Sequence, residues 1–134
     1  MHIRPLQPQE VNLHRELRLR ALQDAPDSLG ATCADAEVQP PSYWEILTRS
    51  VTEPGPHVMF LACEGGTVCG STYGLLDRER SDVGRVGGMW VEPAWRRQGV
   101  GRALLQDPQW AVKVKHRHFD RLSDYAQTAL ETYY

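Results

Sequence analysis

The chain has 134 residues, of which 41% are hydrophobic and 24% charged, as is usual for one globular domain spanning residues 1–134. Its net charge of −2 gives no reason to expect a nucleic-acid partner, and no segment approaches the roughly eighteen apolar residues that a transmembrane helix needs. The N-terminus lacks the apolar stretch of a secretion signal, so we expect a cytoplasmic protein without a membrane partner.

The first forty residues predict a strand, a helix and a loop. Ile3–Leu6 is expected to form a short edge strand, because two prolines limit its pairing. Apolar residues three or four apart predict an amphipathic helix over Gln9–Gln23, and a proline three residues later ends it. Ser28–Gln39 shows little periodicity, which predicts a loop.

A second helix is expected to start at Pro40-Pro41-Ser42. Ser42 is followed three residues later by Glu45, which is the pattern of a capping box with Ser42 as the N-cap. The apolar residues of this segment would form the buried side of the helix; they are Tyr43, Trp44, Ile46 and Leu47.

Three antiparallel strands are predicted next. His57–Cys63 and Thr67–Leu76 flank the tight turn Gly65-Gly66, and Val83–Val91 follows a charged loop over Asp77–Asp82. This order of elements predicts an α/β domain with one layer of sheet.

The cysteines and histidines do not form a metal site that we recognise. The three cysteines have no metal-ligand spacing, and neither do the histidines, so we expect no bound metal. Cys63 and Cys69 could face each other across the predicted hairpin, which makes a disulfide conceivable. In a cytoplasmic protein we expect reduced thiols instead.

The segment after the last predicted strand has the features of a site for a diphosphate. Gly99 and Gly101 remove side chains that would keep an anion away from backbone N–H groups, and a helix is expected to begin near Arg102. Arg96, Arg97 and Arg102 add three cations whose planar guanidinium groups suit phosphate oxygens. A nucleotide site of the P-loop type is disfavoured, since the Gly-Lys-Ser/Thr ending is absent.

These residues resemble a known family. Arg96-Arg97-Gln98-Gly99-Val100-Gly101 is similar to the Arg/Gln-x-x-Gly-x-Gly/Ala signature of the GNAT superfamily of acetyl-CoA-dependent N-acetyltransferases. Leu17–Gly30 is similar to the first helix and loop of many small members. The resemblance is good over residues 3–106 and poor over residues 107–134.

The resemblance implies a fold and a co-substrate. The fold would be the GNAT fold, a mixed and mostly antiparallel central sheet flanked by helices, and the loop would bind the pyrophosphate of acetyl-CoA. The preceding strand would line the pantetheine arm. The implied cofactor-binding residues are Met89, Trp90, Val91, Arg96, Arg97, Gln98, Gly99, Val100, Gly101 and Arg102.

Gly87-Gly88 lies inside the apolar strand that precedes the loop. Glycine there predicts a bulge. Family members carry a bulge in the matching strand, where an amide binds the thioester carbonyl and the oxyanion that follows it. The resemblance therefore implies Met89 and Val91 as backbone donors.

Several residues are candidates for acid–base catalysis, with Glu92 and Tyr133 singled out. An attacking amine must lose a proton, and Glu37, Glu64, Asp77 and Glu92 are candidates for the base; Glu92 is also explained as an exposed turn residue. The family's acid is a tyrosine in an Asn-x-x-Ala-x-x-x-Tyr pattern. Ala126, Ala129 and Tyr133 fit its spacing, with Ala126 where Asn is expected, and Tyr134 is a second possibility.

The end of the sequence departs from the family pattern. Asp107-Pro108 interrupts the expected long helix, which either stops near Gln106 or continues kinked to about His116; the family's need for length favours the second. Phe119–Tyr125 is expected as a strand and Thr128–Tyr134 as a helix. By comparison with the family pattern we expect the final strands of the fold to be missing and a homodimer to be able to cover the open edge.

We therefore expect an N-acetyltransferase that passes the acetyl group of acetyl-CoA directly to a primary amine of a small molecule or a peptide. The alternative is a catalytically impaired or inactive acyl-CoA-binding relative with a shortened C-terminus.

Overall fold

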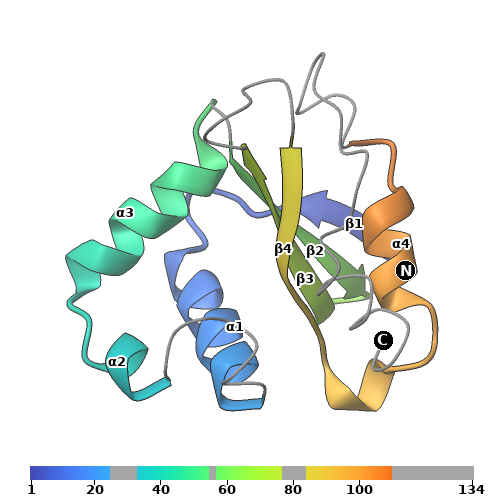
Figure 1. The fold of residues 1–134 in the computed structure, drawn as a ribbon, viewed down its shortest axis with the longest axis horizontal. Helices are drawn as coiled ribbons and strands as arrows, with labels where there is room; N and C mark the ends of the chain where they lie inside the picture. Colours follow the sequence, from blue (N-terminus) through green and yellow to red (C-terminus); the bar gives the residue numbers. More distant parts are fainter. Residues whose placement is uncertain (25–32, 55–56, 77–83, 110–134) are drawn as a thin grey trace.

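The computed structural model describes residues 1–24, 33–54, 57–76 and 84–109 (Figure 1). Four antiparallel strands form one sheet in the order β1-β2-β3-β4. The strands are β1 (His2–Pro5), β2 (Val58–Glu64), β3 (Thr67–Leu76) and β4 (Gly84–Val91). The helices are α1 (Val11–Asp24), α2 (Cys33–Glu37), α3 (Pro41–Thr52), the 3-10 turn η2 (Pro93–Trp95) and α4 (Val100–Gln106).

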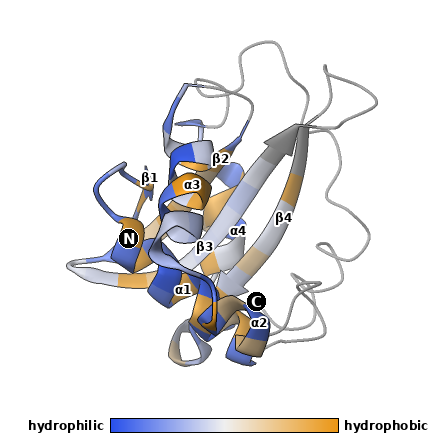
Figure 2. Cartoon of the chain, turned by 90° about the vertical axis from the view of Figure 1, so that its left-hand side faces the viewer, coloured by the Kyte–Doolittle hydropathy of each residue, from blue (hydrophilic) through white to orange (hydrophobic). Residues whose placement is uncertain are grey.

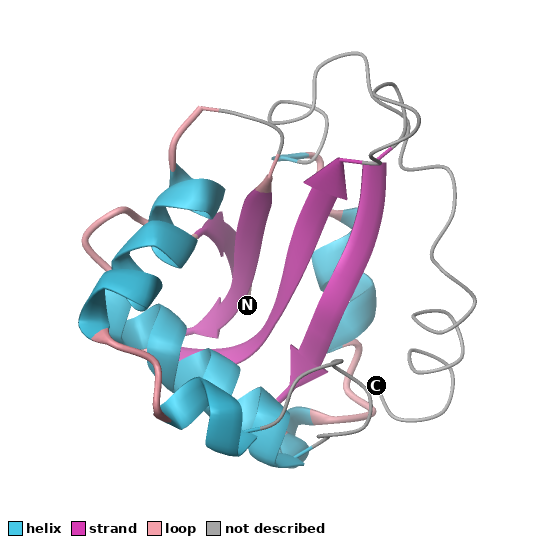
Figure 3. Cartoon of the chain, turned by 60° about the vertical axis from the view of Figure 1, so that its left-hand side comes forward, coloured by secondary structure: helices cyan, strands magenta, loops and turns pink. Residues whose placement is uncertain are grey.

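The described elements form three layers. Helices α1 to α3 lie on one face of the sheet and α4 lies on the other (Figures 1 and 3). Hydrophilic and hydrophobic residues alternate along the helices (Figure 2), as is usual for helices that pack one of their faces against a sheet. The α/β class predicted from the sequence is confirmed.

Strand β2 contributes to the hydrophobic cores on the two faces of the sheet. Val58, Phe60 and Ala62 belong to the core beneath α4, whereas Met59 and Leu61 belong to the core beneath α1 and α3. A strand covered on both faces needs apolar residues on both, which explains its uninterrupted apolar sequence. The turn at Gly65, with φ of 60°, joins β2 to β3 as expected.

The three cysteines are free thiols. Cys63 belongs to the core on the α1 side and Cys69 to the core on the α4 side, so the two side chains point to opposite faces of the sheet. This explains why neighbours across a hairpin do not form a disulfide. Burial raises the pKa of the Cys69 thiol, which disfavours the thiolate needed for oxidation.

The prediction for the second helix is wrong in two details. Helix α3 begins at Pro41, with Pro40 as the N-cap and no side-chain capping bond, so the capping box at Ser42 does not form. Its buried residues are Trp44, Thr48 and Val51, whereas Tyr43 and Ile46 are exposed. Proline at N1 needs no cap for its missing N–H. The buried stripe differs because Thr48 lies inward, with its hydroxyl 2.9 Å from His14 Nδ1.

Two further boundaries differ from the prediction. Part of the expected loop over Ser28–Gln39 is helical, because α2 spans Cys33–Glu37 and packs Ala36 with Leu22 and Trp44. Helix α4 does not continue through residue 107: Asp107 is extended, with ψ of 130°, as favoured for a residue that precedes proline. The strand and helix expected over Phe119–Tyr134 lie outside the described residues.

Candidate functional site

The segment between β4 and α4 contains two residues in the left-handed region. Arg97 has φ of 62° and Gly99, the N-cap of α4, has φ of 86°. No atom lies within 4 Å of a Cβ built on Gly99, so glycine is required there by its backbone angle rather than by lack of space. The left-handed conformation costs Arg97 about 1–2 kcal/mol, which the surrounding contacts must offset.

Helix α4 begins at Val100, two residues earlier than predicted. Its first helical hydrogen bond runs from the Ala103 N–H to the Gly99 carbonyl, at 2.9 Å. The N–H groups of Val100, Gly101 and Arg102 therefore precede the helical ladder, and they carry the positive end of the helix dipole.

The loop is exposed on one side and anchored on the other. Arg97, Gln98, Gly99 and Arg102 are exposed, whereas the α4 face that contains Val100 is buried against the sheet. The Gln98 amide donates to the Ala94 carbonyl at 3.1 Å and closes the turn. Trp95 packs against the core beneath α4. An anion could therefore approach the loop from solvent while α4 stays fixed.

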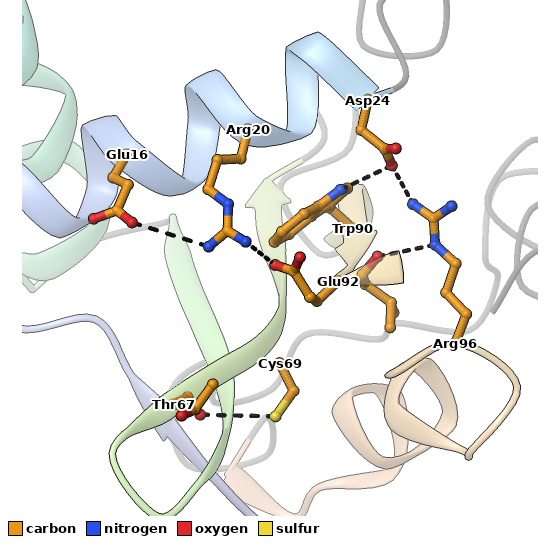
Figure 4. A network of polar contacts seen from close by, with 9 residues as sticks. Glu16, Arg20, Asp24, Thr67, Cys69, Trp90, Glu92 and Arg96 are labelled. Carbon is orange, nitrogen blue, oxygen red and sulfur yellow. Dashed lines mark hydrogen bonds and ion pairs between the residues drawn. The ribbon is translucent and has the colours of Figure 1, made fainter. Parts of the chain in front are cut away.

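Arg96 is held in a polar network that joins the loop to α1 (Figure 4). Its Nε donates to the Val91 carbonyl at 3.0 Å, and its guanidinium forms an ion pair with Asp24 at the end of α1. The same Asp24 oxygen accepts a hydrogen bond from Trp90 Nε1 at 3.1 Å. The Asp24 carboxylate thus connects α1 to the end of β4 and to the start of the loop.

Glu92 lies directly after β4 in the same network (Figure 4). Its backbone N–H donates to the Cys69 carbonyl at 2.8 Å, and its carboxylate forms an ion pair with Arg20 of α1. The Arg20 guanidinium also lies 5.4 Å from the centre of the Trp90 ring, within cation–π range. The Glu92 side chain is 23% exposed, so it is accessible beside the loop.

The other base candidates lie elsewhere. Glu64 is at the β2 end of the hairpin and forms an ion pair with the N-terminus, at 2.9 Å. Glu37 ends α2, where it accepts a hydrogen bond from the Cys33 thiol. The last base candidate, Asp77, lies outside the described residues, and so do the acid candidates Tyr133 and Tyr134.

Strand β4 contains the predicted bulge. Tyr73 of β3 pairs with Gly87 and Ser71 pairs with Trp90, so two residues of β4 lie opposite one residue of β3. Gly88 has φ of 56°, and a Cβ built there would lie 2.8 Å from the Tyr73 ring. Both the backbone angle and the aromatic neighbour require glycine at this position.

A buried polar cluster next to the bulge was not predicted from the sequence. His14 of α1 is fully buried, with Nδ1 2.9 Å from the Thr48 hydroxyl and Nε2 2.6 Å from the Tyr73 hydroxyl. Burial, helped by the nearby Arg18 charge, lowers the pKa of His14 to about 4, and burial raises the pKa of Tyr73 to about 12. Both side chains are therefore neutral near pH 7.

One sequence signal could have located His14. It precedes Leu17 by three residues and Ala21 by seven, so it lies on the apolar stripe of the predicted helix. Its partners come from a different helix and a strand, and no local pattern identifies them.

Within the parts of the chain that the structure describes, no helix is both long and apolar enough to cross a membrane.

Fold and loop together define an α/β protein in which a strand with a bulge leads into a helix whose N-cap is a left-handed glycine. Comparison with known proteins gives the family. The model of the acetyltransferase (GNAT) family matches residues 18–119, and the chain belongs to this family. The match continues past residue 106, the end of the good resemblance found in the sequence.

Individual relatives agree with that assignment. The chain is 32% identical over 113 residues to aminoglycoside N(6')-acetyltransferase type 1 of Stenotrophomonas maltophilia, covering 77% of this chain and 61% of that protein. It therefore spans about three fifths of the length of that relative.

Two solved structures have the same fold. A GNAT-family acetyltransferase from Streptococcus pneumoniae has a TM-score of 0.70 at 19% identity, covering 97% of this chain and 79% of that chain. An acetyltransferase from Clostridium acetobutylicum, solved with acetyl-CoA, has a TM-score of 0.66 at 15% identity, covering 91% of this chain and 79% of that one.

Proposed function

We propose that this chain is an N-acetyltransferase that transfers the acetyl group of acetyl-CoA to a primary amine of a small molecule or a peptide. The observation that carries the proposal is the order of features along one segment: the bulge at Gly88 in β4, then the positive-φ loop that opens α4. A co-substrate with a thioester at one end and a diphosphate further along an extended arm needs two such sites in sequence.

The loop supplies the groups that suit a diphosphate. The N–H groups of Val100, Gly101 and Arg102 precede the helical ladder, and the exposed guanidinium groups of Arg97 and Arg102 add charge. Arg96 anchors this site to α1 and to the end of β4 through its ion pair with Asp24 and its hydrogen bond to the Val91 carbonyl. The pantetheine arm would follow β4 along Met89, Trp90 and Val91, and Gln98 would keep the turn closed.

The chemistry requires two proton transfers and no covalent bond between the acetyl group and the protein. The amine nitrogen attacks the thioester carbon and its C–N bond completes a tetrahedral intermediate. The C–S bond then breaks, while the attacking nitrogen loses a proton and the departing thiolate gains one. We assign Glu92, which lies beside the end of β4, as the base that accepts the proton from the nitrogen. We assign Tyr133 as the acid that donates a proton to the thiolate. A backbone N–H of Met89 or Val91 would stabilise the oxyanion of the tetrahedral intermediate.

An aminoglycoside is the first acceptor to test. The relative from Stenotrophomonas maltophilia is named as an aminoglycoside N(6')-acetyltransferase, and its identity with this chain extends over most of the sequence. Polyamines, amino acids and peptide N-termini complete the panel of amines.

Two measurements test the proposal. Calorimetry with acetyl-CoA should show binding that Arg102→Glu weakens at least tenfold, because the exposed side chain at the start of α4 becomes an anion. Arg49→Glu is the matched control, since Arg49 is an exposed arginine of α3, which lies on the opposite face of the sheet from α4 (Figure 1). The affinity of this variant should equal that of the wild type.

Release of free CoA thiol with the amine panel then separates the two functions that the sequence allows. Turnover with any amine supports the transferase, whereas tight binding without turnover supports an acyl-CoA-binding protein. Equal affinities of wild type, Arg102→Glu and Arg49→Glu would remove the loop from the binding site.

A further inference from the structure

The buried cluster of His14, Thr48 and Tyr73 has no part in the proposed chemistry. It lies in the core between α1, α3 and β3, where His14 and Thr48 are 0% and 1% exposed. Polar groups in such a position lose their hydrogen bonds to water, and the hydrogen bonds among themselves offset this loss only in part. Apolar residues of similar size would therefore stabilise the core at least as well. The cluster therefore needs an explanation other than stability.

Tyr73 connects the cluster to the bulge in β4. Its Cα pairs with Gly87, and a Cβ built on Gly88 would lie 2.8 Å and 3.2 Å from two carbons of the Tyr73 ring. The ring thus occupies the space that glycine leaves open, in contact with the one residue of β4 that has a positive φ in the described range. Where the ring lies determines how the Gly88 backbone is oriented, and with it the peptide group that leads to Met89.

His14 fixes the position of that ring. A neutral imidazole donates from one nitrogen and accepts at the other, so His14 can satisfy the hydroxyls of Thr48 and Tyr73 at once. Because α1 carries His14 and α3 carries Thr48, the Tyr73 hydroxyl is tied to two helices rather than to its own sheet. A tyrosine held by its hydroxyl has less freedom to swing away from the strand that it contacts.

We infer that His14 and Thr48 are positioning residues that act through Tyr73 to hold the Gly88 bulge, and the N–H groups beside it, in the geometry that acyl transfer requires. This inference rests on the proposed function, in which that N–H stabilises the oxyanion. None of the three residues needs to exchange a proton with substrate.

The first test removes single hydrogen-bonding groups. Tyr73→Phe deletes the hydroxyl and keeps the ring, and His14→Ala deletes the tether. Both should lower kcat by about tenfold to a hundredfold, the range that misplacing an oxyanion donor produces, with the KM for acetyl-CoA changed by less than about twofold because the diphosphate loop is intact. His14→Gln, whose side-chain amide can reach toward the tyrosine hydroxyl, should recover part of kcat.

The matched control is Thr52→Val. Thr52 also lies on α3, and its hydroxyl donates to the Thr48 carbonyl at 2.9 Å, so its loss removes a hydrogen bond of the same helix that does not involve Tyr73. This variant should lose stability without losing kcat. If Thr52→Val and Tyr73→Phe lower kcat equally, or if Tyr73→Phe leaves kcat unchanged, the cluster is only a structural part of the core and the inference is wrong.

A second measurement uses the free protein and does not depend on activity. The amide resonance of Met89, and its hydrogen-exchange rate, should change in Tyr73→Phe and His14→Ala and stay as in the wild type in Thr52→Val. If the wild type shows no turnover with any amine, the proposed enzymatic function fails, while this readout still decides whether the cluster holds the bulge. Unchanged Met89 signals in all three variants would overturn the inference.

Discussion

The burial of His14 predicts a loss of stability in mild acid. Folding lowers its pKa from an ordinary value of 6.5 to about 4, so between these values the unfolded chain binds a proton that the folded protein does not. A group that takes up a proton only on unfolding favours the unfolded state, and its destabilising effect grows as pH falls through this window. Above pH 6.5 both states are neutral and the effect vanishes.

The magnitude follows from the two pKa values. Linkage gives a destabilisation of about 2 kcal/mol at pH 5, rising to about 3 kcal/mol at pH 4 and below. Urea unfolding at pH 7 and pH 5 should show this loss in the wild type and not in His14→Gln, which cannot titrate there. Glu10 has its pKa lowered from 4.5 by its hydrogen bond to Arg4, so its stabilising contribution is lost only as pH falls below about 4.5. That loss lies outside the comparison of pH 7 with pH 5, and it is common to both proteins.

Parallel losses in wild type and variant between pH 7 and pH 5 would refute the reasoning. The imidazole would then be accessible to protons in the folded state, which contradicts its position between two helices and a strand.

Three further predictions test other parts of the structure. A methyl group at Gly70 would lie 2.9 Å from a β4 carbonyl and 3.0 Å from an α4 side chain, so Gly70→Ala should destabilise the protein by about 1–3 kcal/mol in denaturant unfolding and weaken acetyl-CoA binding by moving α4. A double-mutant cycle on Arg20 and Glu92 should give a coupling energy of about 0.5–1 kcal/mol that decreases in high salt, as expected for a partly exposed pair; zero coupling in low salt would contradict the ion pair. A thiol reagent should modify Cys33 first in the native protein and the two buried cysteines only on unfolding; equal rates for all three would contradict the described core.

Local patterns were sufficient to predict the individual strands of the sheet. Strands β2 and β3 are bounded by a Gly-Gly turn and a Pro-rich segment, and their apolar residues show the periods of buried strands. The loop at Gly99 was predictable for the same reason, because glycine at fixed offsets from a helix start has a local physical cause.

The buried face of α3 was not predictable, because it depends on a distant partner. Thr48 is a polar residue that lies inward because the His14 imidazole of α1 binds its hydroxyl. Pattern analysis assigns hydrophobic residues to the core, and therefore selected Ile46, which is 64% exposed, over Thr48. The ion pair between Arg96 and Asp24 was not predictable for the same reason, because it joins the loop to a residue at the end of a distant helix.

The bulge at Gly88 affects the anion loop as well as the strand. In a regular strand, Val86 and Trp90 would point to the same face because they are four residues apart. The extra residue reverses the alternation, so Val86 packs in the core beneath α4 and Trp90 packs beneath α1. Only on the α1 side can the Trp90 indole meet Asp24, whose carboxylate also holds Arg96 at the start of the loop. The glycine that shapes the proposed thioester site is therefore also required to anchor the proposed diphosphate site, so a substitution that straightens β4 should impair both.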